Sequence, residues 1–373
     1  MSLFKRAHDN LVLRKKRLLS GLINCIPWGF PRFEKESPGI EQGKYYLITA
    51  NSKVGKTQIA DWLFLYNTIR QVIDNNLEIK LKIFYFTLEM SKEQKMLSAF
   101  SNILYVKENV RIAPKDLRST RADNILSDEI LDLIKKYEPY FNKIEEIVEF
   151  IDDIRNPTGI FKFAYEYAMK NGTQHKKTVE FTDNKTGDTW EKEVDDYYEP
   201  HDPEEYVMVF IDHVSLISTE KKNGIQMNLH QSIVELSSNY LVRLRNKYNY
   251  IPVVIQQQAA AQESLDNFKL GKLKPTASGL GDCKLTFRDA DMIIGLFSPF
   301  IHEIKTYLGY DIMFFRDNIR FLEIIGGREG GGGTNCPLYF DGAVNYFKEL
   351  PSPEDEKKLG LVYNYIEQTI RKK

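Results

Sequence analysis

Short apolar runs alternate with helical stretches from residue 43 onward, and this alternation constrains the fold more than any other feature of the sequence. Most of the runs are nearly continuous in Val, Ile, Leu and Phe, as strands buried on both faces of a sheet are. They lie at Tyr45–Ala50, Lys82–Thr87, Ile147–Asp152, Val207–Asp212, Pro252–Gln256, Asp291–Leu296 and Arg320–Ile325. Helices are expected at 56–76, 91–105, 127–138, 158–171 and 225–249. The pattern predicts an α/β fold with a mostly parallel central sheet flanked by helices.

One segment, about 173–205, interrupts the alternation. Within it, residues 176–194 form two β-rich arms around a turn that contains Asn and Gly, which predicts a β-hairpin inserted on the surface. We therefore expect one α/β domain over 31–350 that carries this insertion. A basic arm over 1–30 precedes the domain, and a C-terminal tail helix over 351–373 follows it.

A phosphate-binding loop is the first chemical signal. It follows an expected strand, opens an expected helix, and matches G-x-x-x-x-G-K-[ST] except that alanine replaces the first glycine. Backbone N–H groups at a helix N-terminus bind phosphate, the lysine adds positive charge, and the threonine hydroxyl can hold Mg²⁺. The nucleotide is expected on Ala50, Asn51, Ser52, Lys53, Val54, Gly55, Lys56 and Thr57. An ordinary strand–turn–helix with a chance lysine is the alternative.

Two acids follow buried strands and are candidates for the chemistry of phosphoryl transfer. Asp212 ends an apolar strand, as an aspartate that holds Mg²⁺ together with Thr57 is expected to do. Glu89 follows the strand Lys82–Thr87 and could orient the attacking water. The carboxyl ends of parallel strands are where open α/β sheets bind ligands. For each acid, helix capping is the alternative interpretation.

Together these motifs resemble the ATPase domain of hexameric replicative DNA helicases of the DnaB type, which have the RecA-like P-loop fold. The resemblance covers about residues 30–350 in the family's motif order. The segments that carry it are Pro38–Gly43, Asn51–Thr57, Phe86–Ser91, Pro252–Gln258, Arg288–Ile294 and Glu323–Gly330.

The resemblance implies ATP and Mg²⁺ as cofactors and a homo-oligomer, a hexameric ring, that unwinds DNA in the 5′–3′ direction. It implies that Lys56 binds phosphate, that Glu89 is the catalytic base, and that Gln258 senses the γ-phosphate. Arg328 would be an arginine finger offered to the nucleotide of a neighbouring subunit. The short region before the domain suggests a phage or mobile-element origin, and it identifies no loader or primase partner.

Two departures from the family pattern leave other functions open. Ala50 replaces a glycine of the phosphate loop, and Gly326 stands where a lysine often precedes the arginine finger, so that Arg328 would act alone. Both departures favour a nucleotide-binding scaffold without turnover. The other alternative is a RecA-like recombinase or another DNA-dependent ATPase that does not unwind DNA.

Residues 259–288 form the candidate loop for single-stranded DNA. The segment joins two expected strands and is rich in lysine and small residues, which suit contacts to phosphates. By register with the family, its turn at Gly281 and Asp282 contacts DNA, and Lys284 replaces the charge of a usual arginine. The expected contacts are Lys269, Lys272, Lys274, Gly281, Asp282, Lys284 and Arg288. A solvated loop without a ligand is the alternative.

Charge is distributed unevenly, although 51 Lys and Arg nearly balance 52 Asp and Glu. Residues 180–205 are strongly acidic, so the insertion is expected on the outer surface, away from DNA. In residues 1–20, leucines are interleaved with basic residues, which predicts an amphipathic helix that docks on a neighbouring subunit. A frayed basic tail that touches DNA is the alternative.

The sequence does not fit membrane or secreted classes. It has no apolar run of about 18 residues, and its N-terminus is charged where a signal peptide would be apolar. Cys25, Cys283 and Cys336 lie far apart, which excludes a disulfide scaffold and a zinc-binding pattern. We expect a cytoplasmic protein, in the host cytoplasm if a phage encodes it.

Overall fold

The computed structural model describes residues 2–75, 77, 79–183, 186–263, 267, 272–328, 332–333 and 335–371. In these residues, nine strands form one sheet with the order β17-β16-β15-β12-β3-β11-β8-β4-β5. They are β3 (Tyr46–Ala50), β4 (Lys80–Thr87), β5 (Val148–Ile151), β8 (Glu205–Asp212), β11 (Ile251–Gln257), β12 (Met292–Phe297), β15 (Ile319–Gly327), β16 (Cys336–Asp341) and β17 (Tyr346–Glu349). Every strand expected from the apolar runs is present, and the predicted fold class is confirmed.

The parallel part of the sheet sets one edge for chemistry. β3 lies between β11 and β12 and is parallel to both, with Tyr46 opposite Val253 and Met292. β8, β4 and β5 continue in parallel on the β11 side. Because parallel strands end at the same edge, the residues after Ala50, Thr87 and Asp212 meet there.

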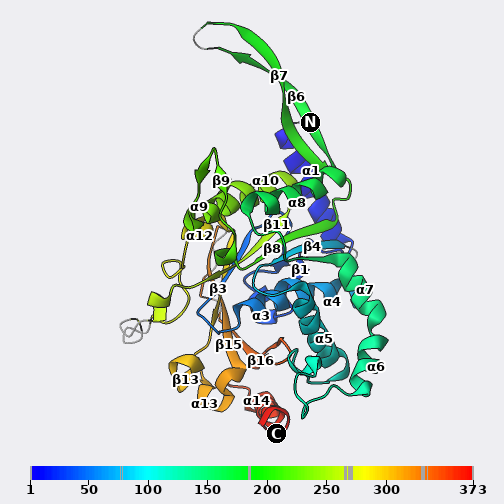
Figure 1. Cartoon of the computed structure of the whole chain (residues 1–373), viewed down its shortest axis with the longest axis vertical. Coiled ribbons are helices and arrows are strands. Elements are labelled where there is room, and N and C mark those ends of the chain that lie inside the picture. Colours follow the sequence, from blue (N-terminus) through cyan, green and yellow to red (C-terminus); the bar gives the residue numbers. More distant parts are fainter. Residues whose placement is uncertain are drawn as a thin grey trace.

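Helices cover both faces of the sheet (Figure 1). They are α1 (Leu3–Leu19), α2 (Pro31–Glu34), α3 (Lys56–Asp61), α4 (Asn67–Ile73), α5 (Lys92–Glu108), α6 (Asp128–Lys136), α7 (Glu138–Ile147), α8 (Pro157–Lys170), α9 (Leu229–Val234), α10 (Val242–Tyr248), α12 (Leu285–Asp289), α13 (Ile312–Phe315) and α14 (Glu356–Tyr365). A π-helical turn at Trp62–Tyr66 joins α3 to α4, and a second one at Glu235–Leu241 joins α9 to α10. Within the described residues, none of the helices is both long and apolar enough to cross a membrane.

Each face of the sheet has its own core. One core packs Phe64 and Ile103 of the α3–α5 side against the sheet, and Trp28 lies within it. The other packs Ile160 of α8 and Leu244 of α10 against the opposite face. This double burial explains why the strands read as continuous apolar runs in the sequence.

The C-terminal strands turn the sheet antiparallel. β15 pairs antiparallel with β12, and β16 and β17 continue in the same manner. A third core lies here and includes Phe315 and Phe321, with Leu359 of α14 against it. Sequence analysis did not identify β16, β17 or α7, and the tail helix that it expected is α14 together with a π-helical turn at Ile366–Arg371.

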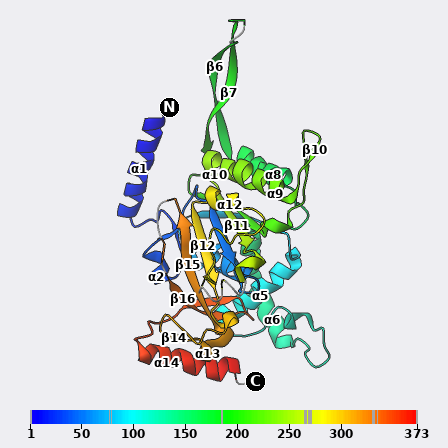
Figure 2. The same cartoon turned by 90° about the vertical axis from the view of Figure 1, so that its left-hand side faces the viewer.

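Two elements project from one end of the molecule (Figure 2). The inserted hairpin, β6 (Gly172–Thr182) and β7 (Thr189–Pro200), is longer at both ends than the expected 176–194. α1 buries none of its described side chains, although it contacts the rest of the chain through an ion pair between Arg14 and Glu41 at 2.7 Å. Both elements are therefore available for contacts outside the domain.

Candidate active site

The loop after β3 has the backbone of a phosphate-binding loop. β3 ends at Ala50, and α3 begins at Lys56 after Gly55, whose φ of +101° lies in the left-handed region. Glycine adopts that conformation at little cost, which explains why it stands immediately before the helix. The first turn of α3 therefore directs its free N–H groups toward the carboxyl edge of the sheet.

A buried arginine supports this loop from below. Arg320 of β15 is 1% exposed, and its Nε donates to the carbonyl oxygen of Val54 at 2.6 Å. Its Nη2 donates to Asp317 at 2.7 Å, and its guanidinium lies 4.5 Å from the centre of the Phe340 ring. Sequence analysis did not identify Arg320, although an arginine inside an apolar strand is itself a signal, because a buried cation needs partners.

Thr57 and Asp212 meet at the start of α3, as the sequence predicts. The Thr57 hydroxyl donates to Oδ1 of Asp212 at 3.0 Å, and Asp212 is fully buried at the end of β8. A hydroxyl and a carboxylate are hard oxygen donors, which Mg²⁺ prefers in proteins. The described residues contain no group of three or more His, Cys, Asp or Glu that could hold a metal alone. The pair therefore fits an ion that shares its ligands with a bound phosphate chain.

Three further groups surround Asp212, and sequence analysis identified none of them. Lys95 of α5 donates to Asp212 at 2.8 Å and to Asp61 at 3.2 Å, and the Tyr85 hydroxyl donates to Asp212 at 3.0 Å and to Asp61 at 2.6 Å. Lys95 lies four residues before the buried Ala99 and eight before the buried Ile103. The helical period therefore places this lysine on the buried face, which is the signal that could have found it.

The charges of this cluster fix the ionisation of the two aspartates. Burial alone would raise the pKa of Asp212, but the charge and hydrogen bond of Lys95 overcome it and hold the pKa below its usual value. Burial raises the pKa of Asp61 to about 6, with Lys95 acting in the opposite direction. Asp212 is therefore the carboxylate that stays ionised, as a metal ligand must.

Glu89 lines a cavity beside the same helix. The cavity has a volume of about 280 Å³, and Thr57, Gln58 and Asp61 also line it. Glu89 itself is exposed, directly after β4. Burial lowers the pKa of Lys56, and the charges of Glu89 and Asp212 act against this shift. Lysine, threonine and both predicted acids are thus brought to one edge of the sheet.

At the end of β11, the structure brings Gln257 rather than Gln258 to the phosphate loop. Lys56 Nζ donates to Oε1 of Gln257 at 3.5 Å. Gln258 is 3% exposed, and its Nε2 donates to Thr49 at 2.9 Å and to the carbonyl oxygen of Thr276 at 3.2 Å. Successive side chains of a strand point to opposite faces, so only one of the two glutamines can face the loop.

Arg328 lies at the opposite edge of the sheet from the phosphate loop. It follows β15, whose Gly327 pairs with Met292 at the start of β12, and Met292 pairs with Tyr46 at the start of β3. Its side chain is half exposed, and its Nε lies 3.5 Å from Oδ1 of Asp291. The arginine therefore does not reach the phosphate loop of its own chain.

Gly326 has a structural reason to lack a side chain. A Cβ atom at this position would lie 2.6 Å from the tip of the Phe287 ring on α12, which is closer than real Cβ contacts. The lysine that the family pattern often has here would displace Phe287. In this chain the departure thus follows from local packing.

The candidate DNA loop is only partly described. Lys269 lies outside the described residues. Lys274 pairs with Glu323 of β15 at 2.6 Å, which neutralises its charge, and Lys272 is exposed. The turn lies against the end of β11, because the Gly281 N–H donates to the carbonyl oxygen of Gln257 at 3.0 Å; Asp282 and Lys284 are exposed beside it, and Arg288 is exposed on α12.

No protein-family model matches the chain. Among curated proteins, it is similar to the replicative DNA helicase DnaB of Helicobacter pylori (strain J99 / ATCC 700824), with 22% identity over 300 residues. The match covers 79% of this chain and 48% of that protein, so the chain spans about half the length of the relative.

Two solved structures share the fold. The ATPase domain of a phage DnaB-like helicase has a TM-score of 0.64 at 18% identity, and the match covers 92% of this chain and 98% of that one. A DnaB-like replicative helicase, described with its interactions with primase, has a TM-score of 0.62 at 18% identity, covering 90% and 66%. The chain therefore has the fold of DnaB-type ATPase domains, which confirms the predicted resemblance and the RecA-like fold class.

Proposed function

We propose that this chain is the motor of an ATP-dependent, ring-shaped DNA helicase that moves along single-stranded DNA during replication. The observation that carries the proposal is the contact between Thr57 and Asp212 beside the loop that bears Lys56, with Glu89 on the same cavity. These are the groups that positioning and charge stabilisation in phosphoryl transfer require. The similarity to a replicative helicase favours unwinding over recombination. The ring would work in the cytoplasm, that of the host if a phage encodes it.

In the proposed reaction, the residues of this chain mainly bind and orient. The N–H groups at the start of α3 and the Lys56 ammonium hold the phosphates of ATP. Thr57 and Asp212 hold Mg²⁺, which, when bound, neutralises charge on the phosphates. Glu89 accepts the proton of the attacking water, and Gln257, rather than Gln258, reports the state of the γ-phosphate to β11.

A forked duplex tests the proposal. With ATP present, we expect strand separation together with hydrolysis, and ring particles in electron micrographs of the same preparation; Lys56→Ala serves as the negative control. Filaments on DNA with hydrolysis but without unwinding would favour a recombinase-like ATPase. Nucleotide binding without hydrolysis would favour a scaffold.

Assembly into a ring is proposed from two surfaces of complementary character. α1 exposes Phe4, Leu11 and Leu18, which lie seven residues apart on one side of a basic helix. A groove of about 300 Å³ between α5, α6 and α7 is lined by apolar side chains, among them Leu131 of α6, and residues 123–153 around it are strongly acidic. An amphipathic basic helix fits an acidic apolar groove, so we propose that α1 of one subunit occupies this groove on the next.

Removing α1 should break the ring. We expect deletion of residues 2–20 to convert rings into monomers or small oligomers at micromolar concentration, as measured by light scattering. Leu131→Glu should have the same effect from the receiving side, and it should leave the fold intact because Leu131 is 49% exposed. Rings that persist after the deletion, with weaker DNA binding, would show instead that the arm is a DNA-contacting tail.

DNA contacts are proposed on the turn and the helix that follow the candidate loop. Lys284 and Arg288 are exposed and four residues apart, so their charges lie on the same side of the chain. Two exposed cations without a rigid apolar surround suit phosphates rather than bases.

Loss of these two charges should change the salt dependence of DNA binding. For the double variant Lys284→Ala and Arg288→Ala, we expect weaker binding to single-stranded DNA and a flatter plot of log affinity against log salt, because fewer counterions are released. Hydrolysis without DNA should be unchanged. The matched control replaces Lys162 and Lys170, which are exposed on α8. An equal slope in the wild type and the double variant would place the DNA elsewhere.

A further inference from the structure

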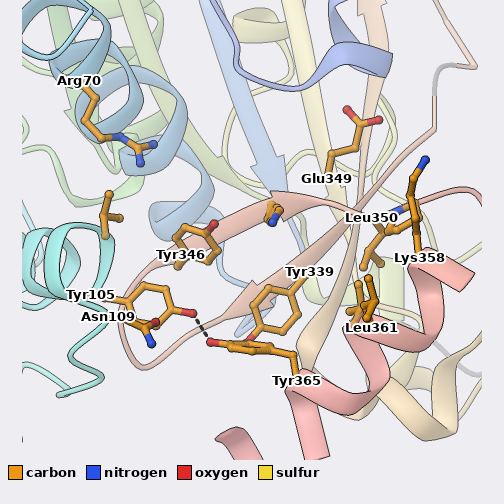
Figure 3. A pocket seen from close by; sticks show the side chains of 14 residues that line it. Arg70, Tyr105, Asn109, Tyr339, Tyr346, Glu349, Leu350, Lys358, Leu361 and Tyr365 are labelled. Carbon is orange, nitrogen blue, oxygen red and sulfur yellow. Dashed lines mark hydrogen bonds between the residues drawn. The ribbon is translucent and has the colours of Figure 1, made fainter.

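A large cavity lies away from the phosphate loop, under the C-terminal helix. Its volume is about 670 Å³, within the range of about 300–1,000 Å³ that small-molecule sites occupy. α4, α5 and α14 form its walls, and β16 and β17 form its floor (Figure 3). None of the predicted nucleotide or DNA residues lines it.

Arg70 of α4 presents an uncompensated charge to this cavity. Its Nε is buried without a hydrogen-bond partner in the described part of the chain. Its guanidinium lies 4.4 Å from the centre of the Trp62 ring, and the nearby Asp74 is engaged by Lys107 at 2.6 Å. Figure 3 shows the guanidinium on the side that faces Tyr346 and Tyr105. A partly buried cation without an anion is costly, so an anionic ligand would recover the lost stabilisation.

Tyrosine rings line much of the remaining wall. Tyr105 and Tyr346 have ring centres 4.9 Å apart, Tyr339 and Tyr365 have ring centres 5.9 Å apart, and the hydroxyls of Tyr105 and Tyr365 form a hydrogen bond (Figure 3). The Tyr339 hydroxyl is buried and has no hydrogen-bond partner among the described residues. Stacking surfaces and a spare polar group thus accompany the cation.

The other charges at the rim do not satisfy Arg70. Glu349 pairs with Arg32 at 3.2 Å, and Lys358 pairs with Asp355 at 2.9 Å. Lys348 is exposed at the rim and adds a second positive charge. The charge that the cavity offers to a ligand is therefore positive.

We propose that this cavity is a binding site for a small anionic molecule with a flat ring. The ring lies among the tyrosines, and the anionic group accepts hydrogen bonds from the Arg70 guanidinium, whose planar fork suits carboxylate, sulfonate or phosphate oxygens. The Trp62 ring holds the guanidinium in place from the other side. The proposal stands independently of the helicase activity.

Anilinonaphthalene sulfonate, an anionic flat-ring dye, is the probe, and phenylnaphthylamine is its uncharged analogue. Binding to the full chain is measured by fluorescence titration, for the wild type and for Arg70→Met, which keeps length and apolar character. We expect one saturable sulfonate site per chain that weakens about tenfold or more in Arg70→Met, because a charge-assisted hydrogen bond is lost. The uncharged analogue should bind both proteins equally. Arg118→Met, at an exposed arginine, is the matched control.

Thermal unfolding separates binding from structure. Since Arg70 has no ionic partner to lose, Arg70→Met without dye should unfold at the wild-type temperature or above it, and the dye should stabilise only the wild type. Equal sulfonate binding by both proteins would overturn the proposal. So would a melting temperature that falls by several degrees without dye, because Arg70 would then be a structural residue.

Discussion

Glu89→Gln should bind ATP with wild-type affinity and hydrolyse it about 10² to 10⁴ times more slowly, which is the usual contribution of a general base. The amide keeps the size of the side chain but cannot accept the proton of the attacking water at neutral pH. Glu89 is exposed on the cavity that it shares with Thr57, so the change should not disturb packing. Affinity is measured with a fluorescent nucleotide, and turnover by phosphate release.

Glu93→Gln is the matched control for this prediction. Glu93 makes the same change of charge four residues further along, on the exposed first turn of α5, and should retain full turnover. If Glu89→Gln hydrolyses ATP normally, another acid is the base. The ionised Asp212 would be the first to examine, because it already contacts Thr57 at 3.0 Å.

The sequence predicts the parallel sheet well because burial on both faces leaves a plain pattern. Phe84 in β4 and Val209 in β8 belong to runs in which nearly every residue is apolar, so period and length suffice to find them. The same logic places Ala50, Thr87 and Asp212 at one edge, since parallel strands all end there. The predicted contact between Thr57 and Asp212 follows from this topology alone.

Contacts between distant elements were harder to predict. Lys95 and Arg320 act through side chains that reach Asp212 and Val54 from other elements, and no local pattern specifies those partners. The choice between Gln257 and Gln258 depends on a register of one residue, which reverses the face that a side chain occupies. β16 and β17 follow a glycine-rich segment and pair antiparallel at an edge of the sheet, where the apolar signal is weaker.

Gly326 shows how a family pattern and local packing can conflict. The pattern implies a lysine, but the Phe287 ring fills the space where its Cβ would lie. Any compensation for the missing lysine must therefore come from Arg328, which is half exposed and leaves the sheet on a turn after Gly327. The isolated chain gives this arginine no phosphate to contact, so its role depends on assembly.

Arg328→Ala should leave the nucleotide affinity of the isolated subunit nearly unchanged and reduce DNA-stimulated hydrolysis by the oligomer about 10³-fold or more, the usual contribution of an arginine finger. Arg328 lies at the edge of the sheet opposite the phosphate loop, so its charge can reach only a nucleotide on another chain. Arg328→Lys keeps the charge but loses the planar fork, and should recover only part of the activity. Wild-type hydrolysis by Arg328→Ala would refute the assignment.

Mixing variants distinguishes an arginine that acts across the interface from one that stabilises its own chain. Arg328→Ala damages one side of a shared site, and Lys56→Ala damages the other. In a mixed ring, an Arg328→Ala subunit supplies an intact phosphate loop, and a Lys56→Ala neighbour supplies an intact arginine, so some interfaces are complete. Hydrolysis should therefore exceed that of either variant alone. Mixed rings that stay inactive, with co-assembly confirmed by affinity tags on each variant, would count against an arginine that acts between subunits.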